Sequence, residues 1–271
     1  MLFDIHTYMG KNPAWGIQGL PVPFTGKDMI KYMDDAGFDA VLAAPPGSGN
    51  SDDFAGDHEI IAQAIATYPG RIYGYYRAKP RRGKAGVDDL LYWIRERGLH
   101  AIKFNSNDSP GYTIGDHKLM GPCLEAIEEC GVPVLIHTGE VYATGATPAL
   151  VCDLARAFPR VQFIVGHMGI PGFHEELVPF MKNTKNTVTE TAGVYRPLQI
   201  TSTVKALGAE RVLLGSNGPY IPLQLGSIAI GEYCGNLTQS EKDLILGGNA
   251  ARILKVKTPA KRKPAPTKAR R

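Results

Sequence analysis

Short apolar runs alternate along this chain with longer segments of helical period. Eight of the runs span four or five residues, are rich in β-branched and aromatic residues, and are bounded by Gly, Pro or polar residues, so they predict buried strands. The predicted strands are Leu2–Ile5, Asp39–Ala43, Ile72–Tyr76, His100–Phe104, Pro133–Ile136, Val161–Val165, Asn186–Glu190 and Arg211–Leu214. The predicted helices are Thr25–Gly37, Asp57–Tyr68, Val87–Arg97, Lys118–Cys130, Pro148–Phe158, Pro171–Met181, Pro197–Leu207 and Thr238–Leu254. This alternation predicts an α/β fold, a single-domain TIM (β/α)8 barrel.

Three histidines stand directly after predicted strands. His6 follows the first strand, His137 the fifth and His167 the sixth. Because the carboxyl ends of barrel strands meet at one mouth, where active sites are built, we expect these three side chains to share a site. The other histidines, predicted to lie at the surface, are His58, His100, His117 and His174.

Further polar residues are expected at the same mouth. Tyr8 lies two residues after His6, so the two side chains share a face if the first strand continues that far. Lys103 is either a clamp for a substrate carboxylate or a residue that fills the barrel and pairs with Glu190. Glu140 and Glu190 are candidates for substrate contacts, for metal ligands, for acid/base groups, or for ordinary solvated carboxylates. The remaining mouth residue, Asn217, follows the eighth strand.

Three loops on the mouth side are candidates for substrate recognition. Met9–Phe24 contains Trp15, a candidate substrate contact, and the other two loops are Pro46–Gly56 and Gly139–Thr147. Neither a GxGxxG nor a Walker A sequence is present, so nucleotide phosphate binding has no support. The substrate is expected to be a small molecule.

Charge divides the chain into two parts. The last fifteen residues, Lys257–Arg271, carry seven Lys or Arg and no acid, so residues 1–256 have a net charge of 4 − 7 = −3. This segment is rich in Pro, Ala and Lys without an apolar period, and predicts a disordered basic tail at 257–271 after a barrel of residues 1–256. A solubilising role is favoured over contact with nucleic acid or an anionic surface.

Composition indicates an ordinary soluble protein. No apolar run approaches the length of a membrane span, and Met1 leads straight into the first strand, so we expect no signal peptide, no membrane contact and a cytoplasmic location. The four cysteines have no CxxC spacing, which favours reduced thiols over disulfides or a zinc knuckle.

Imidazoles combined with carboxylate or amide oxygens suit a divalent metal, zinc first, or manganese or iron where oxygens dominate. Such an ion would acidify a bound water or polarise a substrate carbonyl.

Five motifs, DIHTYMG, VLIHTGE, FIVGHMG, LLGSNGP and ILGGNAARIL, together resemble the amidohydrolase superfamily. The similarity is to the branch around amino-carboxymuconate-semialdehyde decarboxylase and the resorcylate decarboxylases, and it spans Leu2 to Leu254. The resemblance implies a distorted TIM barrel with one metal, held by a His-x-His pair and a third His, and often a homodimer. His6 and His137 match metal ligands, and His167 matches the histidine that activates water or substrate.

Two positions depart from this pattern. Tyr8 replaces the second His of the pair, and Asn217 replaces an Asp after strand eight. Asn carries no charge and cannot act as a base, and a Tyr phenolate needs a nearby cation because its ordinary pKa is about 10. The leading hypothesis is a metal-dependent amidohydrolase-type hydrolase, or a carbon–carbon lyase such as a decarboxylase, acting on a small carboxylate or carbonyl compound. His167 would be its general acid/base, and Asn217 and Tyr8 would be weak ligands or catalytic groups. The alternatives are a metal-free acid/base enzyme of the same fold and a non-catalytic barrel that binds a ligand or partner.

Overall fold

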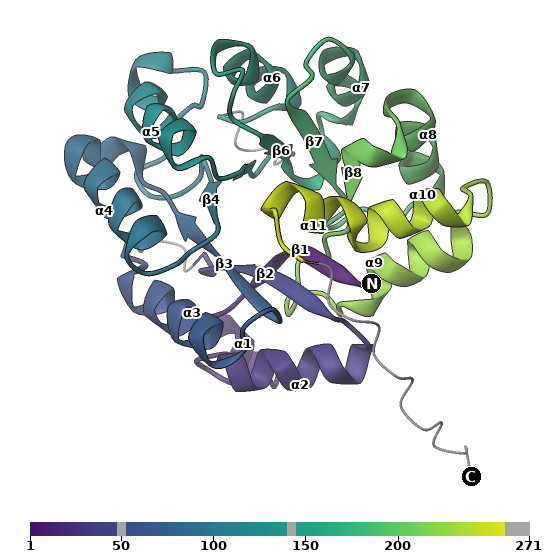
Figure 1. Cartoon of the computed structure of the whole chain (residues 1–271), viewed down its shortest axis with the longest axis horizontal. Coiled ribbons are helices and arrows are strands. Elements are labelled where there is room, and N and C mark those ends of the chain that lie inside the picture. Colours follow the sequence, from purple (N-terminus) through teal and green to yellow (C-terminus); the bar gives the residue numbers. More distant parts are fainter. Residues whose placement is uncertain (48–52, 140–144, 258–271) are drawn as a thin grey trace.

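The computed structural model describes residues 1–47, 53–139 and 145–257, which form the predicted parallel barrel. The strands are β1 (Phe3–Tyr8), β2 (Ala40–Ala44), β3 (Ile72–Arg77), β4 (Ala101–Phe104), β5 (Val134–Ile136), β6 (Phe163–Val165), β7 (Thr187–Glu190) and β8 (Val212–Leu213). They pair in parallel in chain order, and the helices surround them (Figure 1). Every strand residue is buried, as expected for a parallel sheet that is covered on both faces. The predicted fold class is confirmed.

The helices follow the predicted order with shifted ends. They are α1 (Pro13–Ile17), α2 (Gly26–Ala36), α3 (Ala55–Thr67), α4 (Gly83–Arg95), α5 (His117–Cys130), α6 (Pro148–Ala157), α7 (His174–Lys182), α8 (Pro197–Leu207), α9 (Gln224–Ile228), α10 (Gln239–Asp243) and α11 (Asn249–Leu254). A capping box begins α2, in which the Asp28 carboxylate accepts the Thr25 backbone N–H at 2.9 Å.

Three segments differ from the prediction. The stretch between β8 and α10, where no helix was predicted, contains α9 and a π-helical turn, Ala229–Tyr233. The predicted loop after β1 contains α1, which Asn12 caps by accepting the Ala14 backbone N–H at 3.0 Å. The predicted last helix is divided into α10 and α11 by a π-helical turn, Leu244–Gly248. The N-terminal segment packs closely against this turn at Gly247, where the Cβ of any other residue would lie only 2.8 Å from the Met1 carbonyl oxygen.

The ring closes between β8 and β1. The backbone N–H of Ile5 donates to Leu214 O at 3.0 Å, and the backbone N–H of Asn217 donates to His6 O at 2.8 Å. The register between β1 and β2 shifts between Asp4 and Thr7, which is a β-bulge. Bulges often redirect a side chain beside an active site, and this one contains His6.

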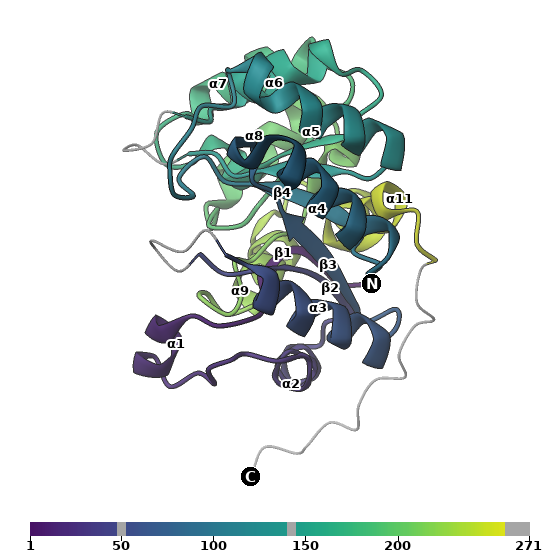
Figure 2. The same cartoon turned by 90° about the vertical axis from the view of Figure 1, so that its left-hand side faces the viewer.

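The strand directions place the mouth. In Figure 2 the N-terminus lies on the right and α1, which follows β1, lies on the left, so the carboxyl ends of the strands face left.

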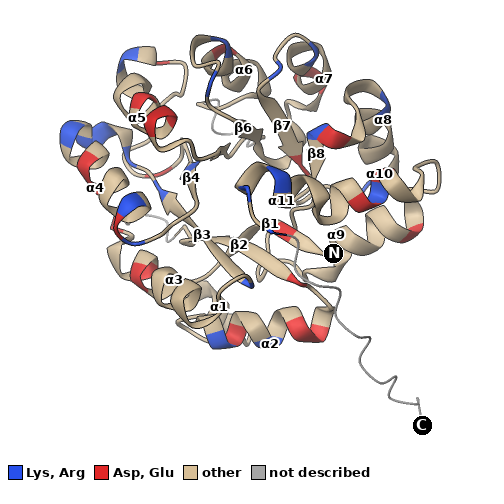
Figure 3. Cartoon of the chain, viewed as in Figure 1, with Lys and Arg blue, Asp and Glu red and all other residues tan. Residues whose placement is uncertain are grey.

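Acidic and basic residues are both spread over the outer helices (Figure 3). Among the described helices, none combines the length and the apolar character that a membrane span requires. The predicted basic tail lies outside the described residues, apart from its first residue, Lys257.

Candidate active site

His6 is bonded at both of its ring nitrogens. Nδ1 lies 2.9 Å from Glu190 Oε1, while Nε2 lies 2.6 Å from Lys103 Nζ and 3.0 Å from the Tyr8 hydroxyl. The backbone N–H of His6, which the bulge removes from the ladder, donates to Asp4 Oδ1 at 2.9 Å. Because a carboxylate can only accept, we assign the ring proton to Nδ1, which leaves the Nε2 lone pair facing Lys103. Burial, followed by the charge of Lys103, holds the pKa of His6 well below 6.5.

Glu190, at the end of β7, links His6 to His167. Its Oε1 also accepts the His167 backbone N–H at 2.6 Å, and its Oε2 accepts the Ala192 N–H at 2.5 Å. Burial by itself raises the pKa of this carboxyl, but His6 and the His167 N–H outweigh it and hold the pKa at about 2. Glu190 is therefore a fully buried carboxylate, and the solvated alternative is wrong.

Lys103 comes from β4 and is fully buried. In addition to its contact with His6, its Nζ donates to the Tyr8 hydroxyl at 2.8 Å and lies 4.2 Å from the centre of the Tyr8 ring. The predicted pairing with Glu190 is indirect, since His6 lies between the two. Burial lowers the pKa of Lys103 and raises that of the Tyr8 phenol, so Tyr8 stays protonated.

His167 sits on strained backbone. His167 and Met168 have φ of 57° and 50°, a left-handed conformation that non-glycine residues rarely adopt and that is found most often at functional sites. The His167 Nδ1 lies 2.8 Å from Ala192 O, so this nitrogen carries a proton. Its Nε2 is left facing the His137 Nδ1 at 3.0 Å.

The three histidines predicted to share a site are therefore adjacent, with one candidate ligand atom from each lying within 4.8 Å of the others. Asn217 is also at the mouth, with φ of 69°, and its buried Oδ1 has no hydrogen-bond partner among the described residues. Glu140 lies outside the described residues.

Two other predicted positions differ from expectation. Trp15 is completely buried and packs edge-on against Phe24 and Tyr220, with ring centres 5.9 Å and 5.3 Å away, so its placement gives no support to a substrate contact. His58 is buried rather than exposed, because α3 turns it toward β3, where its Nε2 accepts the Arg77 backbone N–H at 2.9 Å.

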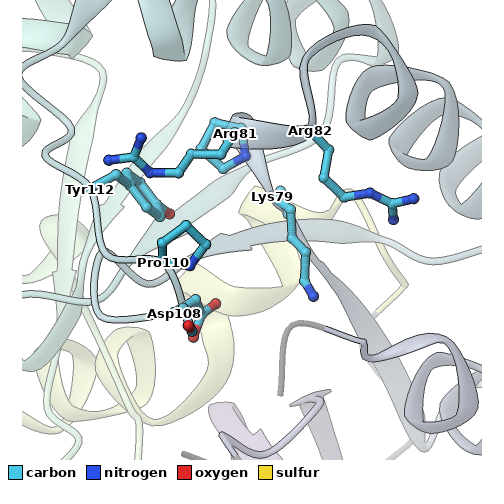
Figure 4. A pocket seen from close by; sticks show the side chains of 9 residues that line it. Lys79, Arg81, Arg82, Asp108, Pro110 and Tyr112 are labelled. Atoms are coloured by element: carbon cyan, nitrogen blue, oxygen red, sulfur yellow. The ribbon is translucent and has the colours of Figure 1, made fainter. Parts of the chain in front are cut away.

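Two pockets open between the loops that follow the strands. One, of about 230 Å³, lies between the loops after β3 and β4, and in Figure 4 the Arg81 and Arg82 side chains extend away from each other at its upper edge. The other, of about 450 Å³, lies between the loops after β6 and β7 and is lined by Tyr195 and Arg196. Neither residue was predicted to belong to the site, although both follow a predicted strand.

The second pocket lies near His167 without being lined by it. Its lining includes Gly193, where an added methyl group would lie 3.8 Å from His167 Nδ1. The pocket is therefore on the Nδ1 side of the ring, the side that is bonded to Ala192 O.

The amidohydrolase sequence model matches residues 5–256. The chain belongs to the amidohydrolase family. The predictions of this family and of an amidohydrolase-type enzyme are confirmed, while no curated protein matches the sequence.

Solved structures of similar shape include three enzymes of known reaction. The 2,6-dihydroxybenzoate decarboxylase from Rhizobium is 16% identical, with a TM-score of 0.73 and coverage of 94% of this chain and 99% of that one. The 4-oxalomesaconate hydratase from Rhodopseudomonas palustris is 21% identical, with a TM-score of 0.71 and coverage of 94% and 96%. A 5-carboxyvanillate decarboxylase from Novosphingobium aromaticivorans, complexed with manganese and a nitrobenzoic acid, is 16% identical, with a TM-score of 0.73 and the same coverage. Identities this low show a shared fold.

The side chains of this amidohydrolase do not fit a divalent ion at His6. The Nε2 that an ion would need faces Lys103 Nζ at 2.6 Å, and both oxygens of Glu190 are already bonded to N–H groups. His137 and His167 offer further imidazole nitrogens, which lie 3.0 Å from each other. The imidazoles, the Tyr8 phenol and the Asn217 amide carry no negative charge when neutral, so they would not offset the charge of an ion. Among the described residues, the features that suit a metal are the adjacent nitrogens of the three histidines and the unpartnered Asn217 Oδ1.

Proposed function

We propose that this amidohydrolase is a carbon–carbon lyase that removes CO2 from a small carboxylate, with His167 as its general acid. The observation that carries the proposal is the hydrogen bond between His167 Nδ1 and Ala192 O, at 2.8 Å, which fixes the ring and directs Nε2 toward His137. Decarboxylation breaks the bond between the substrate carbon and its carboxylate and leaves the electron pair on that carbon. A proton from Nε2 of a doubly protonated His167 then forms the new C–H bond, and solvent replaces that proton.

Hydrolysis is less well supported. It requires a base that takes a proton from water as well as an acid for the leaving group, and because Asn217 cannot accept a proton, His167 would have to serve as both. Decarboxylation requires a proton donor instead, which an imidazole can be. Two of the solved structures of similar fold are decarboxylases, in agreement with this choice.

The substrate carboxylate would bind at Arg196 in the pocket near His167, and the reacting carbon would have to extend from there to Nε2, on the His137 side of the ring. Arg196 lines the pocket, and a guanidinium forms paired hydrogen bonds with carboxylates. Zinc, predicted from the sequence, does not agree with the contacts of His6, whose Nε2 faces Lys103. A homodimer and a cytoplasmic location stay predictions.

The test measures CO2 release from a panel of small hydroxybenzoates and oxo-carboxylates. His167→Gln should lower turnover by at least about 100-fold, while the control His117→Gln changes a histidine that is 43% exposed and pairs with Asp153. Full turnover by His167→Gln would refute the role of His167. Release of an alcohol or amine from esters or amides, without CO2, would identify a hydrolase instead.

A further inference from the structure

Lys103 Nζ lies where a metal bound to His6 would lie. In metal centres a histidine usually donates one ring N–H to a carboxylate and offers its other nitrogen to the ion. His6 has the first half of this arrangement, with Nδ1 2.9 Å from Glu190 Oε1, but its Nε2 meets Lys103 Nζ at 2.6 Å. Because a zinc–nitrogen bond is about 2.0–2.1 Å long, an ion and Nζ would compete for the same lone pair.

Tyr8, which replaces the second histidine of the family pattern, suits a lysine partner. The Tyr8 hydroxyl accepts an N–H from Lys103 at 2.8 Å, and the Tyr8 ring lies 4.2 Å from the same nitrogen, within the range of a cation–π contact. Position 8 therefore holds the lysine side chain through both its oxygen and its ring.

The charges of the site agree with this arrangement. A divalent ion would meet the neutral groups of Tyr8 and Asn217 and a basic side chain, and the carboxylate of Glu190 is engaged on the far side of His6. Lys103 and Glu190 instead face opposite nitrogens of one imidazole, so an amine and a carboxylate are joined through His6.

We propose that Lys103 replaces the divalent metal of the family in this chain, holding His6 and Tyr8 with its side-chain nitrogen and excluding an ion from His6 Nε2. Lys103 is completely buried, so it is a positioning residue that acts through His6 and Tyr8. The inference concerns the same site as the proposed function, but metal content is measured without substrate. Failure of the decarboxylation assay would therefore leave this test unaffected.

The experiment compares metal binding by three forms of the full chain. The wild type, the double variant Tyr8→His/Asn217→Asp, and the same double variant with Lys103→Ala are stripped with a chelator, equilibrated with Mn²⁺ or Zn²⁺ and freed of excess ion. Elemental analysis then gives metal per chain, and calorimetry gives the affinity. The double and triple variants both contain the two ligands of the family pattern that the wild-type chain lacks, and they differ from each other only at Lys103.

We expect the wild type and the double variant to hold well under about a tenth of an equivalent, and the triple variant to hold about one. Its affinity should exceed that of the double variant by at least about 100-fold, because a basic group beside a dication is removed. About one equivalent in the wild type, lost on His6→Ala, would overturn the proposal. Equal binding by the double and triple variants, or no binding by a folded triple variant, would overturn it as well. If circular dichroism shows that Lys103→Ala prevents folding, Lys103→Met removes the nitrogen and keeps the volume.

Discussion

Glu190 Oε1 accepts the ring N–H of His6 at 2.9 Å and lies at the centre of the site. The same oxygen accepts the backbone N–H of His167 at 2.6 Å, although the two histidines come from opposite parts of the chain. One buried carboxylate oxygen thus orients the His6 ring and stabilises the left-handed turn that presents His167.

Glu190→Gln should destabilise the protein by about 3 kcal/mol, because it removes the charged partner of a fully buried group. The folded-state pKa of about 2 lies below the ordinary 4.5, so the contribution of Glu190 is present above pH 4.5 and is lost as the pH falls toward about 2. Urea unfolding of both proteins between pH 2 and 7 measures this. A difference that did not shrink below pH 4.5 would contradict the assignment.

Asp4→Asn should stabilise the protein at neutral pH, whereas Glu190→Gln should destabilise it. Burial raises the pKa of Asp4 from 3.8 to about 7, so the folded protein binds a proton that the unfolded chain has lost, and stability falls as the pH rises from 3.8 to about 7. Asn resembles the neutral acid and keeps an oxygen for the N–H groups of His6 and Ser216. We expect a gain of about 1–2 kcal/mol at pH 7.5 and none at pH 4. A variant less stable than the wild type at pH 7.5 would refute this.

The placement of the histidines at the strand ends could be predicted from the sequence, because it depends only on the local pattern of apolar and polar residues. Each histidine follows an apolar run, and Tyr8 stands two residues after His6, which is enough to place these side chains at one mouth. The partner of Lys103 could not be predicted in this way, since residues 97 positions apart meet only through closure of the barrel and the bulge at His6.

The burial of His58 could have been predicted from the sequence. His58 lies three and four residues before Ile61 and Ala62, which are buried on the same face of α3, so helical spacing alone predicts its burial. The hydrogen bond to Arg77 then depends on how α3 packs against β3, which single-sequence patterns do not contain.

Asp108→Asn should destabilise the protein by about 3 kcal/mol, because it breaks a buried ion pair. Asp108 accepts two hydrogen bonds from Arg77, at 2.9 Å and 2.5 Å, and the two side chains are only 10% and 3% exposed. The control Asp88→Asn removes a carboxylate that is 57% exposed and bonded to Lys84, and it should leave stability unchanged. Chemical denaturation of both variants tests the contrast, and equal losses would show that burial is not the cause.

Arg196→Gln should weaken binding of a carboxylate substrate and leave the chemical step nearly intact. Arg196 lines the pocket beside His167, and a lost charge-assisted hydrogen bond costs roughly 1.5–3 kcal/mol, so KM should rise by at least about ten-fold while kcat changes little. Arg160→Gln is the matched control, since this arginine is 79% exposed and pairs with Glu128 on the outer surface. Steady-state kinetics on the substrate found by CO2 release gives both constants. An unchanged KM would show that the substrate carboxylate does not bind Arg196. A fall in kcat alone would show that Arg196 contacts the transition state rather than the bound substrate.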